Sequence, residues 1–447
     1  MNRNKIVILG AGESGAGAAV LAQKKGYDVF VSDSGTIKDK YKKIFSEKGI
    51  AFEEKQHTME KILDANEIIK SPGVNERTPV MKAVSEKKIP VCGEIEFASR
   101  YTNAKLIGIT GTNGKTTTTL LTHYILTKGG LKAGLTGNVG HSLAMMVAEN
   151  PQDYYVIELS SFQLDDMKNF KADISILLNI TPDHLDRYES LDHYIASKFS
   201  VTRNQTADDA FIYCDDDDAI TENIQRQNIR PQRFPFSIKK KNIPGAYLDN
   251  NEIIIQLKPN QTQFTMSIYN LSLQGKHNVY NSMAAAVAAN ILGIRKEVIR
   301  DCLSDFRNAE HRLEFIATVH GVDYVNDSKA TNVNSTWYAL ECFHKPMVLI
   351  LGGIDKGNDY GILKDLVQEK VKAIVCLGKD NKKIHRAFGD IVKNIVDTSS
   401  ADEAVAAAKQ IAVKGDVVLL SPACASFDLF DNYEDRGRKF KNAVKAL

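Results

Sequence analysis

Short apolar runs separated by amphipathic, helix-like stretches recur along the whole chain. In the first 94 residues the runs are "KIVILG", "DVFVSD", "EIIKSPG" and "IPVCG". The pattern returns in "KLIGITG", "YYVIELS", "ISILLNI" and "AFIYCDD", and again in "PMVLILGG", "KAIVCLG" and "DVVLLSP". Buried strands alternating with helices predict parallel sheets with crossover helices.

One stretch, residues 245–273, departs from this pattern. Polar and apolar residues alternate in "GAYLDNNEIIIQLKPNQTQFTMSIYNLSL", and Asp249-Asn250-Asn251 supplies a turn, so we predict antiparallel hairpins here. The length of 447 residues suits about three domains. We therefore predict an α/β protein of three domains. They are a Rossmann-like domain over residues 1–94, a P-loop ATPase-like parallel sheet with added hairpins over 95–308, and a second Rossmann-like domain over 309–447.

Composition and charge narrow the class of protein. The chain is 43% hydrophobic and 25% charged, which is ordinary for a globular protein with real cores. Its 57 basic and 55 acidic residues are well mixed, so we expect neither a nucleic-acid partner nor, without long apolar runs, a membrane. The six cysteines form no CxxC pair, which favours a reducing compartment. We expect a cytoplasmic enzyme, and a monomer.

The first of two glycine-rich loops is "GAGESG" at residues 10–15. Gly10, Gly12 and Gly15 follow a predicted strand, and Asp33 ends the next one. In this context GxGxxG allows a pyrophosphate to approach a helix N-terminus, while the aspartate accepts a hydrogen bond from a ribose hydroxyl. The loop indicates either a dinucleotide cofactor or a nucleotide-sugar. A role for the glycines in packing alone stays open.

The second loop lies between the strand "KLIGIT" and a threonine-rich helix. It differs from a standard P-loop because Ile109 stands where the first glycine would be. Its backbone N–H groups can still wrap phosphates, its lysine can supply charge, and a threonine hydroxyl can reach Mg²⁺. We predict ATP as the ligand of this loop, which comprises Gly111, Thr112, Asn113, Gly114, Lys115, Thr116 and Thr117.

The loop "GTNGKTT" resembles the ATP loop of the Mur ligase family, which also includes the folylpolyglutamate synthases. Five other family markers follow in order: "GNVG" (137–140), "ELSSFQL" (158–164), "NITPDHLDRY" (179–188), "GKHNVYN" (275–281) and "EHRLE" (310–314). Four stretches are similar to the branch that adds D-glutamate to UDP-N-acetylmuramoyl-L-alanine: "KSPGV" (70–74), "DSKATN" (327–332), "GGIDKG" (352–357) and "SPACASFD" (421–428). The resemblance implies an ATP-dependent ligase of peptidoglycan precursor synthesis that works through an acyl phosphate.

The resemblance also implies a catalytic centre with two Mg²⁺ ions. Thr116 and Glu158 would hold the first, and His184 and a carbamylated Lys198 the second. A carbamate suits this place, because an anion with two oxygens binds a hard cation that would repel an ammonium. The family's other ATP-side positions match Asn278 and Asn281 for the base, Arg312 for the transferring phosphate, and Asp327 for ribose or a metal-bound water.

The remaining matches concern the two other substrates. The uridine-contacting positions correspond to Glu13, Ser14, Asp33, Ser34, Ser71 and Gly73, and contacts to the sugar or its diphosphate correspond to Asn138 and Gln163. D-Glutamate would meet Lys329 and Lys356 through its carboxylates, and Thr331 and Ser426 through hydroxyl contacts. Tyr433 replaces a phenylalanine of some family members, and its hydroxyl meets either the glutamate or water.

Three alternatives remain open from the sequence. Another Mur-type or folylpolyglutamate-type ligase shares the ATP loop. An NAD-dependent oxidoreductase would explain "GAGESG" and Asp33 but leaves the second loop without a role. A regulatory P-loop protein would hydrolyse ATP without joining anything.

Overall fold

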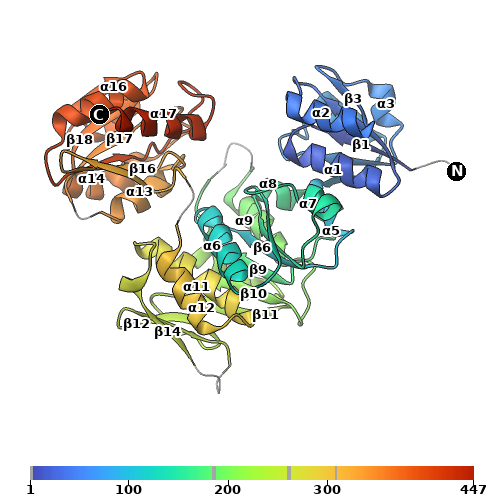
Figure 1. The fold of residues 1–447 in the computed structure, drawn as a ribbon, viewed down its shortest axis with the longest axis horizontal. Coiled ribbons are helices and arrows are strands. Elements are labelled where there is room, and N and C mark those ends of the chain that lie inside the picture. The colour runs from blue at the N-terminus through green and yellow to red at the C-terminus, as the bar shows by residue number, and fades with distance from the viewer. Residues whose placement is uncertain (1–3, 184–187, 259–262, 308–309, 344) are drawn as a thin grey trace. The chain divides into compact units, whose positions relative to one another are not determined.

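The computed structural model describes residues 4–183, 188–258, 263–307, 310–343 and 345–447 (Figure 1). The chain divides into two compact units, Met1–Asn270 with Tyr280–Asp305, and Leu271–Val279 with Phe306–Leu447. The first unit contains two mainly parallel sheets with their helices, and the second contains one. The predicted α/β class with three sheet domains is therefore confirmed, whereas the exact boundaries at 94/95 and 308/309 stay predictions.

The first sheet is wholly parallel and has the strand order β3-β2-β1-β4-β5. Its strands are β1 (Lys5–Leu9), β2 (Asp28–Asp33), β3 (Ala51–Glu54), β4 (Glu67–Lys70) and β5 (Val91–Gly93). The helices are α1 (Glu13–Lys24), α2 (Asp39–Lys48), α3 (Met59–Leu63), α4 (Pro79–Glu86) and α5 (Glu94–Ser99). Because β1 is central, the loop "GAGESG" leaves the carboxyl end of the middle strand, where α/β sheets bind ligands.

The second sheet has nine strands in the order β14-β13-β12-β11-β10-β9-β6-β8-β7. They are β6 (Lys105–Thr110), β7 (Ala133–Gly137), β8 (Tyr154–Glu158), β9 (Ile174–Leu177), β10 (Ala210–Cys214), β11 (Gln232–Ser237), β12 (Gly245–Asp249), β13 (Glu252–Gln256) and β14 (Phe264–Ser267). Figure 1 shows the strands β12 and β14 at one edge of this sheet. The predicted turn is confirmed: Asn250 and Asn251 adopt positive φ angles of 47° and 65°, as a tight hairpin turn requires.

The helices of the second sheet connect its strands, except for the last two, which follow its final strand β14. They are α6 (Lys115–Lys128), α7 (Leu143–Glu149), α8 (Ser161–Asp165), α9 (Leu191–Phe199), α10 (Asp218–Arg226), α11 (Lys276–Ile291) and α12 (Lys296–Asp305). Strand β6 pairs with β8 on one side and β9 on the other, so the second glycine loop also leaves a central strand.

A continuous hydrophobic core joins the first two sheets into one unit. Helix α1 packs against α7 so closely that a Cβ on Gly17 would lie 1.9 Å from Ser142 Oγ. Glu94 is buried at this junction and accepts hydrogen bonds from Ser142 Oγ (2.7 Å) and the backbone N–H of Ala144 (2.6 Å). Burial raises the pKa of Glu94 to about 7. Lys70, also fully buried, forms an ion pair with Asp166 (2.9 Å) from the second sheet's side.

The third sheet has the order β15-β16-β20-β17-β18-β19. Its strands are β15 (Glu314–Val319), β16 (Val322–Asn326), β17 (Met347–Leu351), β18 (Val371–Leu377), β19 (Ile395–Thr398) and β20 (Val417–Leu420). Its helices are α13 (Val333–Glu341), α14 (Lys364–Lys370), α15 (Lys382–Phe388), α16 (Ala401–Ile411) and α17 (Tyr433–Lys445). Strands β16, β20 and β17 are parallel neighbours, so the three loops that follow them meet at one edge of the sheet.

Among the described residues, no helix has the length and apolar character that crossing a membrane requires. The pattern of apolar runs did not predict several strands, among them β3, β11 and β16. Their sequences, "AFEE", "QRFPFS" and "VDYVN", mix charged residues or a proline into short segments, so their strand structure depends on pairing with neighbours.

The first glycine loop yields a stability prediction. In Gly15→Ala the new Cβ would lie 1.8 Å from the carbonyl oxygen of Gly10, so the backbone must move. We expect a loss of about 2–3 kcal/mol in the free energy of unfolding, measured by urea denaturation. Gly12→Ala is the matched control: no atom lies within 4 Å of its Cβ, so its cost should stay below about 1 kcal/mol. Equal losses in both variants would contradict this explanation.

Candidate active site

The second glycine loop turns from β6 into α6 through two glycines with positive φ angles. Gly111 has a φ of 152°, and Gly114, the residue before the helix, has a φ of 82°. A Cβ on Gly114 would lie 2.4 Å from Oδ1 of Asn281, the same oxygen that accepts a hydrogen bond from Thr118 (3.2 Å). Asn281, which the sequence analysis assigned to the nucleotide, therefore lies against the loop and limits which residues can replace Gly114.

A neighbouring segment after β9 braces this loop. Asn179 accepts from the backbone N–H of Thr112 with its carbonyl (2.9 Å) and from that of Asn113 with its side chain (2.8 Å). Thr181 donates its backbone N–H to Thr112 Oγ1 (3.0 Å). Neither Asn179 nor Thr181 was singled out from the sequence, although both lie in "NITPDHLDRY". These hydrogen bonds attach the loop to the segment after β9.

A cavity of about 410 Å³ opens beside the loop. It is lined by Pro72, Gly73, Lys115, Asn138, Ser160, Ser161, Phe162, Gln163, Asp183, Tyr194 and Lys198. The sequence analysis predicted five of these as site residues. Gly73 was assigned to uridine, Asn138 and Gln163 to the sugar or diphosphate, and Lys115 and Lys198 to catalysis. The structure therefore brings predicted nucleotide-sugar and ATP-loop residues around one space.

Lys198 lies almost completely inside the protein, on α9. It is 1% exposed, donates a hydrogen bond to the carbonyl oxygen of Gly111 (2.8 Å), and lies 4.5 Å from the centroid of the Tyr194 ring. Burial, followed by the nearby charge of Lys115, holds the pKa of Lys198 well below its ordinary value. A lysine in this setting can present a neutral amine at neutral pH.

Glu158 ends β8, is 1% exposed, and is hydrogen-bonded to Asn138, which lines this cavity. Its Oε1 accepts a hydrogen bond from Asn138 (3.0 Å), whereas its buried Oε2 has no hydrogen-bond partner among the described residues. A buried carboxylate oxygen without a donor is well suited to a cation. Thr116, buried in the first turn of α6, is the other predicted ligand. The residues present therefore fit one Mg²⁺, while His184, predicted for the second, lies outside the described residues.

Asp33 was predicted to accept a hydrogen bond from a ribose hydroxyl, but both oxygens of its carboxylate accept hydrogen bonds from the backbone. Its Oδ2 accepts from the backbone N–H of Ala11 (2.7 Å) and its Oδ1 from that of Gly35 (2.7 Å), so both oxygens already stabilise the loops. Glu13 is exposed and accepts a hydrogen bond from Tyr41 (2.8 Å), and Ser71 donates to the carbonyl of Gly10 (3.3 Å). Ser14 and Ser34 flank the same loops, half-buried and exposed respectively.

In the second unit, Arg312 lies between two residues of unusual backbone conformation, His311 and Leu313, whose φ angles are 65° and 44°. The Leu313 N–H donates to Asp327 Oδ1 (3.2 Å), and Ser421 donates to Asp327 Oδ2 (2.9 Å). Burial raises the pKa of Asp327 to about 7. Asn278, on α11, donates its side-chain N–H to the carbonyl of Gln274 (2.7 Å).

The residues predicted to bind the amino-acid substrate lie on the loops at the carboxyl edge of the third sheet. Lys329 follows β16 with its Nζ 5.5 Å from the centroid of the Tyr433 ring, and Thr331 is half-buried beyond it. Lys356, after β17, is exposed, while Ser426, after β20, is 2% exposed. The structure thus places these residues on one edge, from three different strands.

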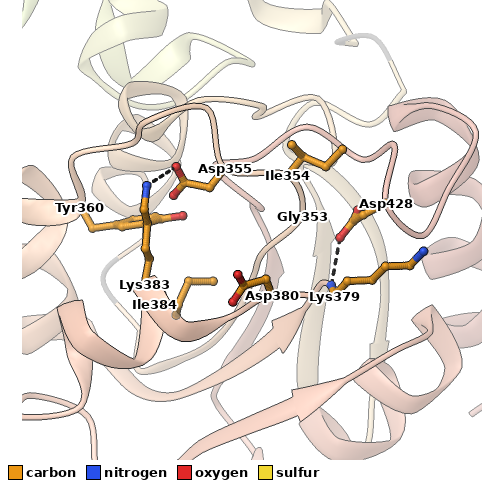
Figure 2. Close-up of a pocket in the computed structure, with 9 residues that line it drawn as sticks. All are labelled: Gly353, Ile354, Asp355, Tyr360, Lys379, Asp380, Lys383, Ile384 and Asp428. Atoms are coloured by element: carbon orange, nitrogen blue, oxygen red, sulfur yellow. Dashed lines mark hydrogen bonds and ion pairs between the residues drawn. The ribbon is translucent and has the colours of Figure 1, made fainter.

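A second cavity, of about 350 Å³, adjoins the loop after β17 (Figure 2). Figure 2 shows Lys383 and Asp355 pointing toward one another across it, at an Nζ–Oδ1 distance of 2.7 Å. Although burial opposes ionisation, Lys383 and the N–H groups of Gly357 and Asn358 hold the pKa of Asp355 below its usual value. These bonds order the loop that carries Lys356.

Three family models match the chain. The Mur ligase middle domain matches residues 109–289, the Mur ligase glutamate ligase domain matches residues 311–424, and the MurD N-terminal domain matches residues 5–80.

Similar full-length proteins agree with these matches. UDP-N-acetylmuramoylalanine–D-glutamate ligase of Christiangramia forsetii is 55% identical over 99% of both chains, and that of Bacteroides fragilis is 54% identical over 99% of this chain and 100% of its own. Two solved structures share the fold. A pseudomurein peptide ligase type C from Methanothermus fervidus has a TM-score of 0.65 at 20% identity, covering 99% of this chain and 100% of its own. UDP-N-acetylmuramate-alanine ligase from Thermotoga maritima has a TM-score of 0.64 at 18% identity, covering 99% of both.

The contact between Gly114 and Asn281 yields a test of the loop. Gly114→Ala combines a strained backbone with a clash against Asn281. We therefore expect the affinity for ADP, measured by calorimetry, to fall at least about tenfold, which corresponds to about 1.4 kcal/mol. Gly293→Ala is the control, because its φ of 79° carries the same strain but no atom lies within 4 Å of its Cβ. Both should lose about 1–2 kcal/mol of stability. Unchanged ADP affinity in Gly114→Ala would contradict the assignment of the loop.

Proposed function

The chain belongs to the Mur ligase family, and we propose that it joins D-glutamate to UDP-N-acetylmuramoyl-L-alanine at the expense of ATP, in peptidoglycan precursor synthesis. The observation that carries this proposal is the 55% identity, over 99% of both chains, to a relative named for that ligation. The oxidoreductase alternative loses its support, because the residues around "GAGESG" match the N-terminal domain of a ligase.

The reaction must turn a carboxylate into something that an amine can attack. Transfer of the γ-phosphoryl group from ATP to the carboxylate of the L-alanyl group gives an acyl phosphate and ADP. The amine of D-glutamate then attacks the carbonyl carbon, and phosphate leaves as the amide forms. The first step brings anions together, so the site must supply positive charge.

The residues around the 410 Å³ cavity suit these demands. The end of the loop, at Gly114 and the first turn of α6, would offer backbone N–H groups to the phosphates, because those of Thr112 and Asn113 already bond to Asn179. Lys115, whose ammonium bonds to the carbonyls of Gly111 and Thr112, would bring positive charge to the same place. Glu158 and Thr116 would hold Mg²⁺, which neutralises charge on the β- and γ-phosphates when bound. Arg312 would stabilise the transferring phosphoryl group, and Asn278 and Asn281 would contact the base.

Lys198 has the properties that carbamylation requires. Its neutral amine can attack CO₂ through the nitrogen lone pair, forming an N–C bond and releasing a proton to give an anionic carbamate. The depressed pKa of Lys198 supports this step, since an ammonium has no lone pair to donate. Carbamylated Lys198 and His184 would share a second Mg²⁺ next to the reacting carboxylate.

The other substrate residues follow the same division. Glu13, Ser14, Ser34, Ser71 and Gly73 would contact the uridine end. Asp33 would act through the loops that its carboxylate stabilises as well as through ribose. Asn138 and Gln163 would contact the sugar or diphosphate.

The third sheet would receive the amino acid. Lys329 and Lys356 would pair with its carboxylates, and Thr331, Ser426 and Tyr433 would complete the site. Asp327 would contact ribose or a metal-bound water.

We further propose that the enzyme is a cytoplasmic monomer. All six cysteines carry free thiols, which agrees with a reducing compartment.

Substrate choice tests the proposal directly. Phosphate release should require UDP-N-acetylmuramoyl-L-alanine and D-glutamate together, measured across a panel of D- and L-amino acids. L-Glutamate and neutral D-amino acids should give less than about one-tenth of the rate, because two lysines favour a second carboxylate and stereochemistry directs the amine. Comparable turnover with L-glutamate would refute D-glutamate as the substrate.

Lys198 permits a test by spectroscopy as well as by activity. With ¹³C-bicarbonate, the wild-type protein should show a carbamate ¹³C signal that is absent from Lys198→Ala. The variant should lose at least about 100-fold in turnover while it remains folded and binds ADP, because a metal ligand is gone. Acetate should restore part of the activity. Lys168→Ala, which removes an exposed lysine, is the control and should keep both signal and rate. Full activity of Lys198→Ala would reduce Lys198 to a structural residue.

A further inference from the structure

A fully buried arginine lies in the first turn of α17. Arg436 has 0% of its surface exposed and is among the largest fully buried side chains of the described residues. Burial lowers the pKa of its guanidinium to about 10, so the group stays charged at neutral pH. Removing such a charge from water is costly unless oxygen atoms of the protein replace its hydration.

All three guanidinium nitrogens donate hydrogen bonds to neutral oxygens. Nε donates to the hydroxyl of Ser328 (2.9 Å), and Nη2 donates to the carbonyl of the same residue (2.8 Å). Nη1 donates to the carbonyl of Cys424 (3.2 Å) and, at longer range, to that of Gly352 (3.5 Å). Ser328 in turn donates its hydroxyl to the carbonyl of Tyr433, which closes the arrangement onto the start of α17 (2.8 Å).

The acceptors lie on three separate loops of the third sheet. Ser328 follows β16, Gly352 follows β17, and Cys424 follows β20, and these strands are neighbours in the order β16-β20-β17. A guanidinium is planar and directs its donors at fixed angles, so it can hold three loops at set distances from one another. An ammonium on a flexible chain cannot reproduce that geometry.

Each of these loops continues into residues assigned to the amino acid. Lys329 and Thr331 follow Ser328, Lys356 comes four residues after Gly352, and Ser426 comes two residues after Cys424. We propose that Arg436 is a positioning residue that sets the spacing of the loops carrying Lys329, Lys356 and Ser426, and thereby the affinity for D-glutamate. This inference rests on the proposed function.

A ligand with two carboxylates makes this spacing matter. Its two anionic groups are a fixed distance apart, so the cations that receive them must be held at a matching separation. The two glycine loops belong to the other two sheets, whereas the guanidinium of Arg436 donates its hydrogen bonds to loops of the third sheet. Substituting Arg436 should therefore raise the KM for D-glutamate more than the KM for ATP or for the UDP-linked substrate.

The test compares Arg436→Lys, Arg436→Met and the control Arg438→Met in the full-length enzyme. Arg438 lies on the same helix, but its side chain is 59% exposed and only 3.7 Å from Asp435, in a surface ion pair. Initial rates are measured with each of the three substrates varied in turn. In both Arg436 variants the KM for D-glutamate should rise at least about tenfold. The KM values for ATP and the UDP-linked substrate should change less than about twofold, and Arg438→Met should match the wild type.

Circular dichroism and thermal unfolding accompany the kinetics. The lysine variant keeps the charge and most of the side-chain volume, so the comparison stands if the methionine variant does not fold. A lysine variant with an unchanged KM for D-glutamate, with equal losses for all three substrates, or without a folded structure would overturn the positioning role. A wild-type enzyme inactive with D-glutamate would instead refute the proposed function.

Discussion

The backbone carbonyl of Gly111 accepts hydrogen bonds from two lysines, Lys115 and Lys198, each at 2.8 Å. One lysine begins α6, directly after the second glycine loop, and the other comes from α9, far along the chain. Burial and, after it, repulsion by the charged amine of Lys115 lower the pKa of Lys198 and so favour its neutral form. Tyr194 and Asn138 line the same cavity as the two lysines, and Asn138 donates a hydrogen bond to Glu158, so the candidate active site is built around this point.

A shared core joins the first two sheets, and with them the two glycine loops. Glu94 and the close approach of Gly17 to Ser142 fix helix α1 against α7. Glu96 adds a second buried carboxylate that accepts backbone N–H groups of residues 168–170. Polar groups buried with full hydrogen bonding specify one packing over others. As a result Gly73, which follows β4 of the first sheet, and Lys115, which begins α6, line one cavity.

The third sheet uses another device, because its site is made of loops. Its carboxyl edge is held by Asp327 and Ser421 between β16 and β20, and by Arg436 across three loops. Backbone bonds between Ile354 and Ala425 join the loops after β17 and β20 (2.8 Å). Rigid loops lower the conformational entropy lost when a small, highly charged ligand binds. The exposed Lys356 can therefore be positioned without being buried.

The sequence by itself determined the local features of this protein. The alternation of apolar runs predicted the parallel sheets, and the Asp249–Asn251 turn predicted the hairpin. The order of the motifs indicated the family. These signals depend on residues near one another in the chain, where periodicity and glycine conformation act directly. Tertiary structure alone decided that Asn179 braces the second glycine loop, that both Asp33 oxygens bind backbone, and that Arg436 spans three loops. Those outcomes join residues separated by tens to more than a hundred positions, and a lone arginine or asparagine carries no local pattern that predicts its partners. Burial, which lowers the pKa of Lys198 and raises that of Asp327, arises only when distant segments pack together.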